Sequence, residues 1–233
     1  MGSCAAKLRR FADCMEGPCA RPAKNGGFAE IHQVFCGGTD TRWGYSMNER
    51  ADSFIAHLCE LAKHDRGALA HLRRSLGFAP GAFPPAYPYV ERFVPRGRPA
   101  NDPWRKALYL TAGLFARHPE HREDESLASA LGRLARARES ASIERRFIAL
   151  LGAESDGLPN MLRQVASLLA ADGHPCDYGS LLNDLGVWLR PLDSDGRDRI
   201  RQRWARDFYR TYDTTLETAD NDQSDLNEST TTN

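Results

Sequence analysis

Apolar residues recur at the spacing of an α-helix along most of this chain. Between residues 48 and 77 they lie three, four or more residues apart, at Phe54, Leu58, Leu61, Leu69, Leu72 and Leu76. Because a helix turns about 100° per residue, these side chains share a stripe that needs burial. Alternating runs of Val, Ile and Thr, which predict strands, do not occur. The sequence therefore predicts an all-α protein.

Start and stop signals divide this pattern into separate helices. Asp102 before Pro103 is a strong start, because Asp caps free backbone N–H groups and Pro fits the first helical position. The repeated prolines of residues 78–99 exclude a long helix there. By the same reasoning, further helices are expected to begin at Ser126, Ser142, Leu158, Asp177 and near Gly196.

The texture of the sequence suggests four segments. The first has glycine pairs and no clear period, and the last has acids but no Lys or Arg. Met47 opens the periodic part and is, beside Met1, a possible biological start. Between the end segments we expect two small helical bundles with a seam near residues 118–126. The segments are an irregular or disordered extension (1–46), an N-terminal helical subdomain (47–120), a C-terminal helical bundle (121–212) and a disordered acidic tail (213–233).

The composition indicates a soluble protein of the cytoplasm. No stretch approaches the roughly 18 uninterrupted apolar residues of a membrane span, and the basic N-terminal residues lack the apolar run of a secretory signal. The six cysteines are then expected to be reduced thiols rather than disulfides.

The net charge of zero hides an uneven distribution. Residues 213–233 contain six acids and no Lys or Arg, and without them 31 basic residues face 25 acidic ones, a net charge of +6. A basic body suggests an anionic partner, although a solvated surface with a disordered tail explains the same numbers.

Catalytic signatures are missing from the sequence. It contains no GxSxG, no HExxH and no phosphate-binding loop with Lys and Ser or Thr, so we expect neither catalysis nor a cofactor. His118 and His121 would form half a metal site, but their loop is rich in charge and favours solvated histidines. The spacing of Cys14, Cys19, His32 and Cys36 fits a small zinc finger. Because aliphatic residues that would cover the metal are lacking, disorder is the favoured interpretation.

Arginines recur on the expected solvent faces of successive helices. Arg145 and Arg146 lie in the first turn of the helix that Ser142 would cap, where backbone N–H groups also favour anions. An ion pair with Glu139 or Glu144 is an equally good explanation of the two arginines. Residues 61–106 hold nine basic residues against three acids, and a further stripe follows the last helix. The candidate phosphate-binding residues from these patterns are Lys63, Arg66, Arg73, Arg74, Arg145, Arg146, Arg199, Arg203 and Arg206.

Few aromatic residues are expected at the surface of such helices. Recognition of the nucleic-acid backbone, without sequence preference, is therefore predicted.

Five blocks of the sequence resemble the CasB family, the small subunit of the type I-E CRISPR surveillance complex Cascade. They are RGALAHLRRSLG, AYPYV, LGRLARARESASIERRFIALLGAE, LRQVASLLAADGHPCDYGSLLNDLGVWL and WARDFY. Their order and spacing match across about residues 49–210, and the combination is more specific than any single block.

The resemblance implies an all-α, non-enzymatic, cytoplasmic protein of antiviral defence. Two copies would lie head to tail along the backbone subunits of Cascade, with the large subunit as a further partner, in a complex that pairs CRISPR RNA with target DNA. The small subunits would stabilise the R-loop by giving the displaced non-target strand a basic path.

The family's nucleic-acid contacts carry over to matching arginines of this chain. They imply such contacts at Arg73, Arg74, Arg133, Arg145, Arg146 and Arg163. Gly152, Glu154 and Gln164 stand where some relatives have further basic residues, so the path is expected to run differently here, with help from the stripe on the last helix.

Two other functions remain open from the residues alone. A helix-turn-helix regulator would present Asn, Gln or Ser to base edges, whereas the basic helices here offer mainly Arg and Ala. A helical adaptor would dock its basic faces on an acidic protein without touching nucleic acid.

Overall fold

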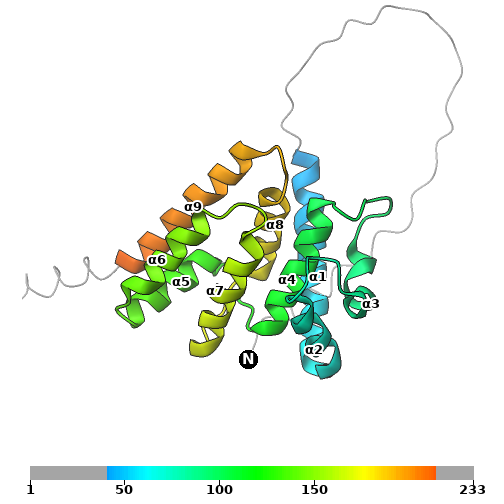
Figure 1. Cartoon of the computed structure of the whole chain (residues 1–233), viewed down its shortest axis with the longest axis horizontal. Coiled ribbons are helices and arrows are strands. Elements are labelled where there is room, and N and C mark those ends of the chain that lie inside the picture. Colours follow the sequence, from blue (N-terminus) through cyan, green and yellow to red (C-terminus); the bar gives the residue numbers. More distant parts are fainter. Residues whose placement is uncertain (1–40, 214–233) are drawn as a thin grey trace, which may run out of the picture. The chain divides into compact units, whose positions relative to one another are not determined.

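The computed structural model describes residues 41–213 of the chain, with side chains from residue 48 onward. This part contains helices and no strand, apart from an isolated bridge between His121 and Cys176, so the all-α prediction is confirmed. The α-helices are α1 (Thr41–His64), α2 (Arg66–Ser75), α3 (Tyr87–Val90), α4 (Pro103–Arg117), α5 (Leu127–Ala137), α6 (Ala141–Leu151), α7 (Leu158–Asp172), α8 (Tyr178–Trp188) and α9 (Ser194–Asp213) (Figure 1).

The first helix begins earlier than the sequence pattern indicated. We expected residues 1–46 to be irregular, but α1 already includes residues 41–46. Once Ala51, Phe54 and Leu58 are buried, adding further turns costs little, because helix growth is easier than nucleation. The rest of the predicted extension and residues 214–233 of the predicted tail lie outside the described residues.

The proline-rich stretch forms only short helical turns, as predicted. It contains two 3₁₀ helices, η1 (Pro84–Ala86) and η2 (Glu91–Phe93), on either side of the four-residue α3. Prolines occupy the first positions of η1 and α3, where a missing N–H group does no harm.

Helix α4 lies at the centre of the packing. Asp102 caps it by accepting a hydrogen bond from the backbone of Arg105 at 3.0 Å, and its residues from Ala107 to Ala116 are all buried. It packs against α1, α2, α7 and α8. A Cβ atom at Gly113 would lie 2.7 Å from the Leu76 side chain, so this glycine allows α2 and α4 to approach closely.

Helices α5 and α9 pack along each other, and α6 packs against both of them. The Phe147 ring of α6 stacks on Phe208 of α9 with centroids 4.1 Å apart. A Cβ atom at Gly132 of α5 would lie 2.5 Å from the main-chain oxygen of Phe208, so only glycine permits this approach. The shared face buries Leu131, Leu134 and Phe208.

One cluster of buried residues runs through all of these helices, from Ala51 to Phe208. Helix α8, which belongs to the second predicted bundle, packs against α1 and α4 of the first as well as against α9. The division of the helical part near residue 120 remains a prediction.

At this predicted seam, the loop between α4 and α5 is hydrogen-bonded to the segment between α7 and α8. His118 is 2% exposed, and its Nε2 lies 2.7 Å from the main-chain oxygen of His174. The Tyr178 hydroxyl donates to the main-chain oxygen of His118 at 2.7 Å. The expectation that His118 is solvated was therefore wrong, because the α7–α8 loop folds over it. In the same seam, Nδ1 of half-buried His121 lies 3.3 Å from both the main-chain oxygen of Cys176 and the main-chain nitrogen of Tyr178.

Candidate nucleic-acid interface

The predicted arginines fall into two groups when their partners are compared. Some are held by carboxylates of the protein, which cancel much of their charge. Others bond only to neutral groups, or make no ion pair with any described residue. An unneutralised guanidinium keeps both its charge and its free N–H groups for an external anion.

Arg133 and Arg203 belong to the first group. Arg133 forms a two-pronged pair with Glu125, whose side chain is only 7% exposed, and its Nε–Oε1 distance is 3.0 Å. Arg203 pairs with Asp184, which also accepts a hydrogen bond from the indole Nε1 of Trp204 at 2.7 Å. Burial raises the pKa of the Asp184 carboxyl, although Arg203 opposes this shift. Both arginines form ion pairs with buried carboxylates. Their main role is therefore to stabilise the fold rather than to bind an external anion.

Arg73 and Arg163 belong to the second group, and the structure brings them to one place. The Nε of Arg73 donates to the main-chain oxygen of Ala116 at 3.0 Å. Arg163 donates to the main-chain oxygen of Leu76, which ends α2. Helices α2, α4 and α7 thus meet through arginine-to-carbonyl bonds.

Arg117 joins the same place, and sequence reasoning missed it. Its Nε donates to the Ser167 hydroxyl at 3.1 Å, and that hydroxyl donates to the main-chain oxygen of Arg163 at 2.8 Å. The available signal was weak: a basic residue in the last turn of a helix, which the helix dipole alone explains. We call Arg73, Arg74, Arg117 and Arg163 the arginine junction.

The charges of the arginine junction are not cancelled inside the described part of the chain. None of the four arginines forms an ion pair there. Helices α2 and α4 contain no acid, and the one acid of α7, Asp172, is paired with Arg138. The Nε of Arg163 is buried without a hydrogen-bond partner among these residues. Three like charges linked in this way, with the exposed Arg74 next to Arg73 in α2, favour an anion with several phosphates.

A second unpaired set lies on α6. Arg145 and Arg146 are exposed and make no ion pair within residues 48–213. The alternative partner Glu144 instead accepts a hydrogen bond from the Tyr209 hydroxyl at 2.9 Å. The helix begins at Ala141, so the prediction that Ser142 caps it was wrong; the N-cap residue is Ser140, whose side chain bonds to none of the helix N–H groups.

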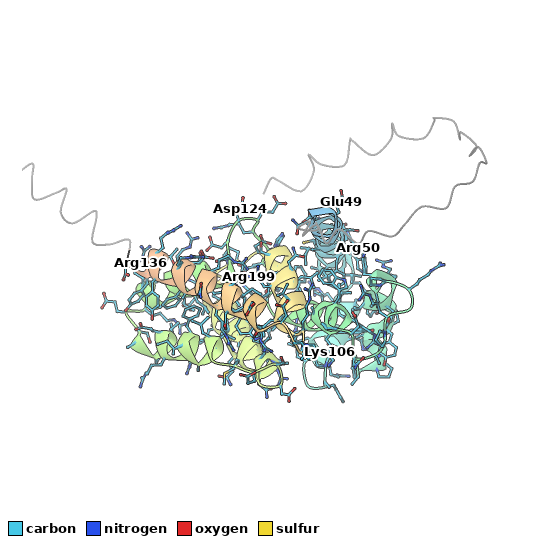
Figure 2. The ribbon with its side chains drawn as sticks, turned by 90° about the horizontal axis from the view of Figure 1, so that it is seen from above. Glu49, Arg50, Lys106, Asp124, Arg136 and Arg199 are labelled. Atoms are coloured by element: carbon cyan, nitrogen blue, oxygen red, sulfur yellow. The ribbon has the colours of Figure 1, made fainter. Side chains whose placement is uncertain are left out.

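The remaining predicted residues are scattered. Lys63 pairs with Glu60 at 2.8 Å, both largely exposed, and Arg199 bonds to the main-chain oxygen of Asp195. Arg66 and Arg206 are exposed. The predicted α9 stripe is therefore interrupted at Arg203 by its pair with Asp184. Figure 2 shows Arg199 of α9 apart from the labelled Lys106 of α4 and Arg136 of α5.

The described residues meet neither the requirements of a metal site nor those of a membrane-spanning helix. No group of three side chains able to hold a metal ion occurs among residues 48–213, and the four zinc-finger residues lie outside the described part. In that same part, no helix has the length and apolar character to cross a membrane.

A family model described as CRISPR-associated protein Cse2 matches residues 68–209. The chain belongs to the Cse2 family. A relative of this name from Thermus thermophilus is 41% identical over 143 residues, which are 61% of this chain and 78% of the relative. The predicted resemblance to CasB is confirmed, because solved structures under that name are also similar.

The Cse2 fold of the helical part is shared with solved structures. A crystal structure of a Cse2-family protein from Thermus thermophilus is 37% identical, with a TM-score of 0.59 over 68% of this chain and 97% of that one. CasB from M. ruber is 31% identical, with a TM-score of 0.57 over 72% and 97%. A chain of a CRISPR RNA-guided surveillance complex, 23% identical, has the same fold with a TM-score of 0.61 over 74% and 99%.

The Cse2 match includes the arginine junction and both arginines of α6. It leaves out all of α1, including Lys63, and the first two residues of α2, including Arg66.

Proposed function

We propose that this chain is the non-catalytic small subunit of a type I-E CRISPR RNA-guided surveillance complex, Cascade, in antiviral defence. It stabilises the R-loop through sequence-independent contacts to nucleic-acid backbone, chiefly that of the displaced non-target DNA strand. The observation that carries this proposal is the arginine junction, where three helices hold the guanidiniums of Arg73, Arg117 and Arg163 without a carboxylate partner among the described residues, and where Arg74 follows Arg73 in α2.

The energetics of strand exchange make such contacts sufficient. The RNA–DNA heteroduplex that forms is about as stable as the DNA duplex it replaces, so moderate protein–backbone contacts decide the balance. Arg145 and Arg146 extend the contact from the junction to α6, and Arg199 and Arg206 are the further candidates on α9. Arg133 and Arg203 act mainly by keeping the helices in place.

The proposed partners follow from the family. They are the backbone and large subunits of Cascade, a second copy of this chain placed head to tail, the CRISPR RNA and the target DNA. Membership in the Cse2 family supports this assembly, and so does the fold shared with a chain of a CRISPR RNA-guided surveillance complex.

The direct test measures binding of the purified full chain to labelled single-stranded DNA, single-stranded RNA and duplex DNA at two salt concentrations. The test variant is Arg145→Ala combined with Arg146→Ala. Arg136→Ala is the matched control, because Arg136 is exposed on α5 and carries no proposed contact. We expect sequence-tolerant, salt-sensitive binding to single strands that the double variant weakens and the control retains.

Other outcomes would favour the alternatives. Binding that requires one duplex sequence would favour a helix-turn-helix regulator. The absence of any nucleic-acid binding at low salt would contradict the proposal and favour a helical adaptor that docks on an acidic protein. Helix α6 argues against base reading, since its exposed residues are Ala141, Arg145, Arg146, Ile148 and Ala149, without Asn or Gln.

A further inference from the structure

An exposed aromatic residue follows the end of α2, close along the chain to the arginine junction. Phe78, three residues beyond α2, is 51% exposed. Only two other large apolar residues of the described part are comparably open, Ile148 and Leu192, and neither is aromatic. Half-exposing a phenylalanine forfeits much of its burial energy, so this position calls for a physical reason.

The backbone fixes Phe78 close to the arginines. The N–H of Phe78 donates to the main-chain oxygen of Ser75, and that of Gly77 donates to the oxygen of Arg74, both at 3.0 Å. Leu76, two residues before Phe78, accepts the hydrogen bond from Arg163. Phe78 therefore lies four residues after Arg74 and two residues after the carbonyl group that binds Arg163.

The Phe78 ring also packs against a second aromatic ring. Phe83 stacks against Phe78 with centroids 4.9 Å apart and an interplanar angle of 26°. The loop between them is held in shape, because the Tyr87 hydroxyl donates to the main-chain oxygen of Gly81 at 3.0 Å and Ala82 N–H donates to the oxygen of Ala79 at 2.9 Å. One face of Phe78 is covered by Phe83, and a supported ring loses little entropy when it receives a partner.

We propose that Phe78, backed by Phe83, stacks on a base of the single strand whose phosphates bind the arginine junction. The inference rests on the proposed function and makes it more specific. Single-stranded nucleic acid is the occupant that fits, because it combines phosphates for the arginines with an open base face for the ring. Duplex DNA does not fit, since its bases are stacked on one another. At this one position, recognition then goes beyond the backbone contacts that the sequence predicted.

The test uses the purified full chain and two single strands of equal length, one with thymine bases and one built of abasic sites. Phe78→Ala removes the ring, Phe78→Leu keeps apolar bulk without an aromatic face, and Phe78→Trp keeps the face. We expect Phe78→Ala and Phe78→Leu to weaken binding to the thymine strand by roughly 5- to 100-fold. Phe78→Trp should bind it normally, and all variants should bind the abasic strand as the natural chain does.

The matched control is Ile148→Ala, because Ile148 is 53% exposed and therefore similarly open. It should leave binding to both strands unchanged, and circular dichroism with thermal unfolding checks that each variant is folded. If the natural chain binds both strands and Phe78→Ala binds the thymine strand as tightly as the natural chain does, stacking is overturned while the phosphate contacts stand. If Phe78→Leu binds like the natural chain, apolar contact rather than stacking is responsible, and the inference is again wrong. If the natural chain binds neither strand, the proposed function fails and takes this inference with it.

Discussion

The guanidinium of Arg163 in α7 donates a hydrogen bond to the main-chain oxygen of Leu76, which ends α2 87 residues earlier in the chain. This bond satisfies one of the carbonyl groups that the end of a helix leaves without an internal partner. It also fixes where Arg163 lies relative to Arg73 and Arg117. A single side chain thus links α2 to α7 at the arginine junction.

Replacing Arg163 is expected to lower stability as well as binding. Arg163→Ala leaves the Leu76 carbonyl without this donor, which costs about 1–3 kcal/mol in the free energy of unfolding. Urea unfolding followed by circular dichroism measures the loss. Arg74→Ala is the control, because Arg74 is exposed and should change stability by no more than about 0.5 kcal/mol. Equal unfolding midpoints for the two variants would contradict this structural role.

Arg145 and Arg146 are expected to affect binding without affecting the fold. The double alanine variant should unfold at the same urea concentration as the natural chain, since both side chains are exposed and unpaired in the described part. Its affinity for single-stranded DNA should fall. The slope of log K against log salt should decrease by about 1.4, because each phosphate contact contributes about 0.7 for single strands. An unchanged slope would show that neither arginine neutralises a phosphate.

The Arg133–Glu125 pair is expected to matter more for folding than for binding. Arg133→Ala leaves the nearly buried Glu125 carboxylate without its main partner. Because Arg133 is 43% exposed and water screens the pair, we expect a loss of only about 1–2 kcal/mol. A double-mutant cycle with Glu125→Gln should show coupling in urea unfolding. Additive effects, combined with a large binding defect, would instead assign Arg133 to the nucleic-acid surface.

Burial of Cys176 predicts that its thiol is unreactive in the folded chain and that the free energy of unfolding depends on pH. Its surroundings raise the pKa of the thiol to about 12 from an ordinary value of 9.0, mainly through desolvation. Between these pH values the folded chain keeps the proton that the unfolded chain loses, so the free energy of unfolding falls as the pH rises above about 9. Relative to Cys176→Ala, the natural chain should lose up to about 1.4 kcal/mol per pH unit in this range.

Alkylation supplies an independent measurement of the same thiol. Iodoacetamide at pH 8 should modify Cys176 only after unfolding, whereas the half-buried Cys59 should react faster in the folded chain. Mass spectrometry of the two peptides distinguishes them. Rapid labelling of Cys176 in the folded chain would show that the α4–α5 and α7–α8 loops open readily.

Features that depend on neighbouring residues in the chain were predictable from the sequence. The apolar spacing identified the helices, and Asp102, Ser126 and Asp177 do cap α4, α5 and α8. The exposure of Arg145 and Arg146 also followed from the helical period, because a residue's face on an amphipathic helix is set by its distance from the buried positions. The start of α6 was off by two residues, since Ser140 and Ser142 offer equivalent local signals.

The sequence by itself thus determined the helices, their buried faces and, through the resemblance, the family. Only the tertiary structure decided which arginines stay unpaired: Arg133 and Arg203 meet buried carboxylates, whereas Arg73, Arg117 and Arg163 meet carbonyl and hydroxyl oxygens. The same holds for the burial of His118 and the exposure of Phe78. The physical reason is distance along the chain. Each of these outcomes depends on contacts between segments brought together by packing of the whole core, and local periodicity does not contain that information.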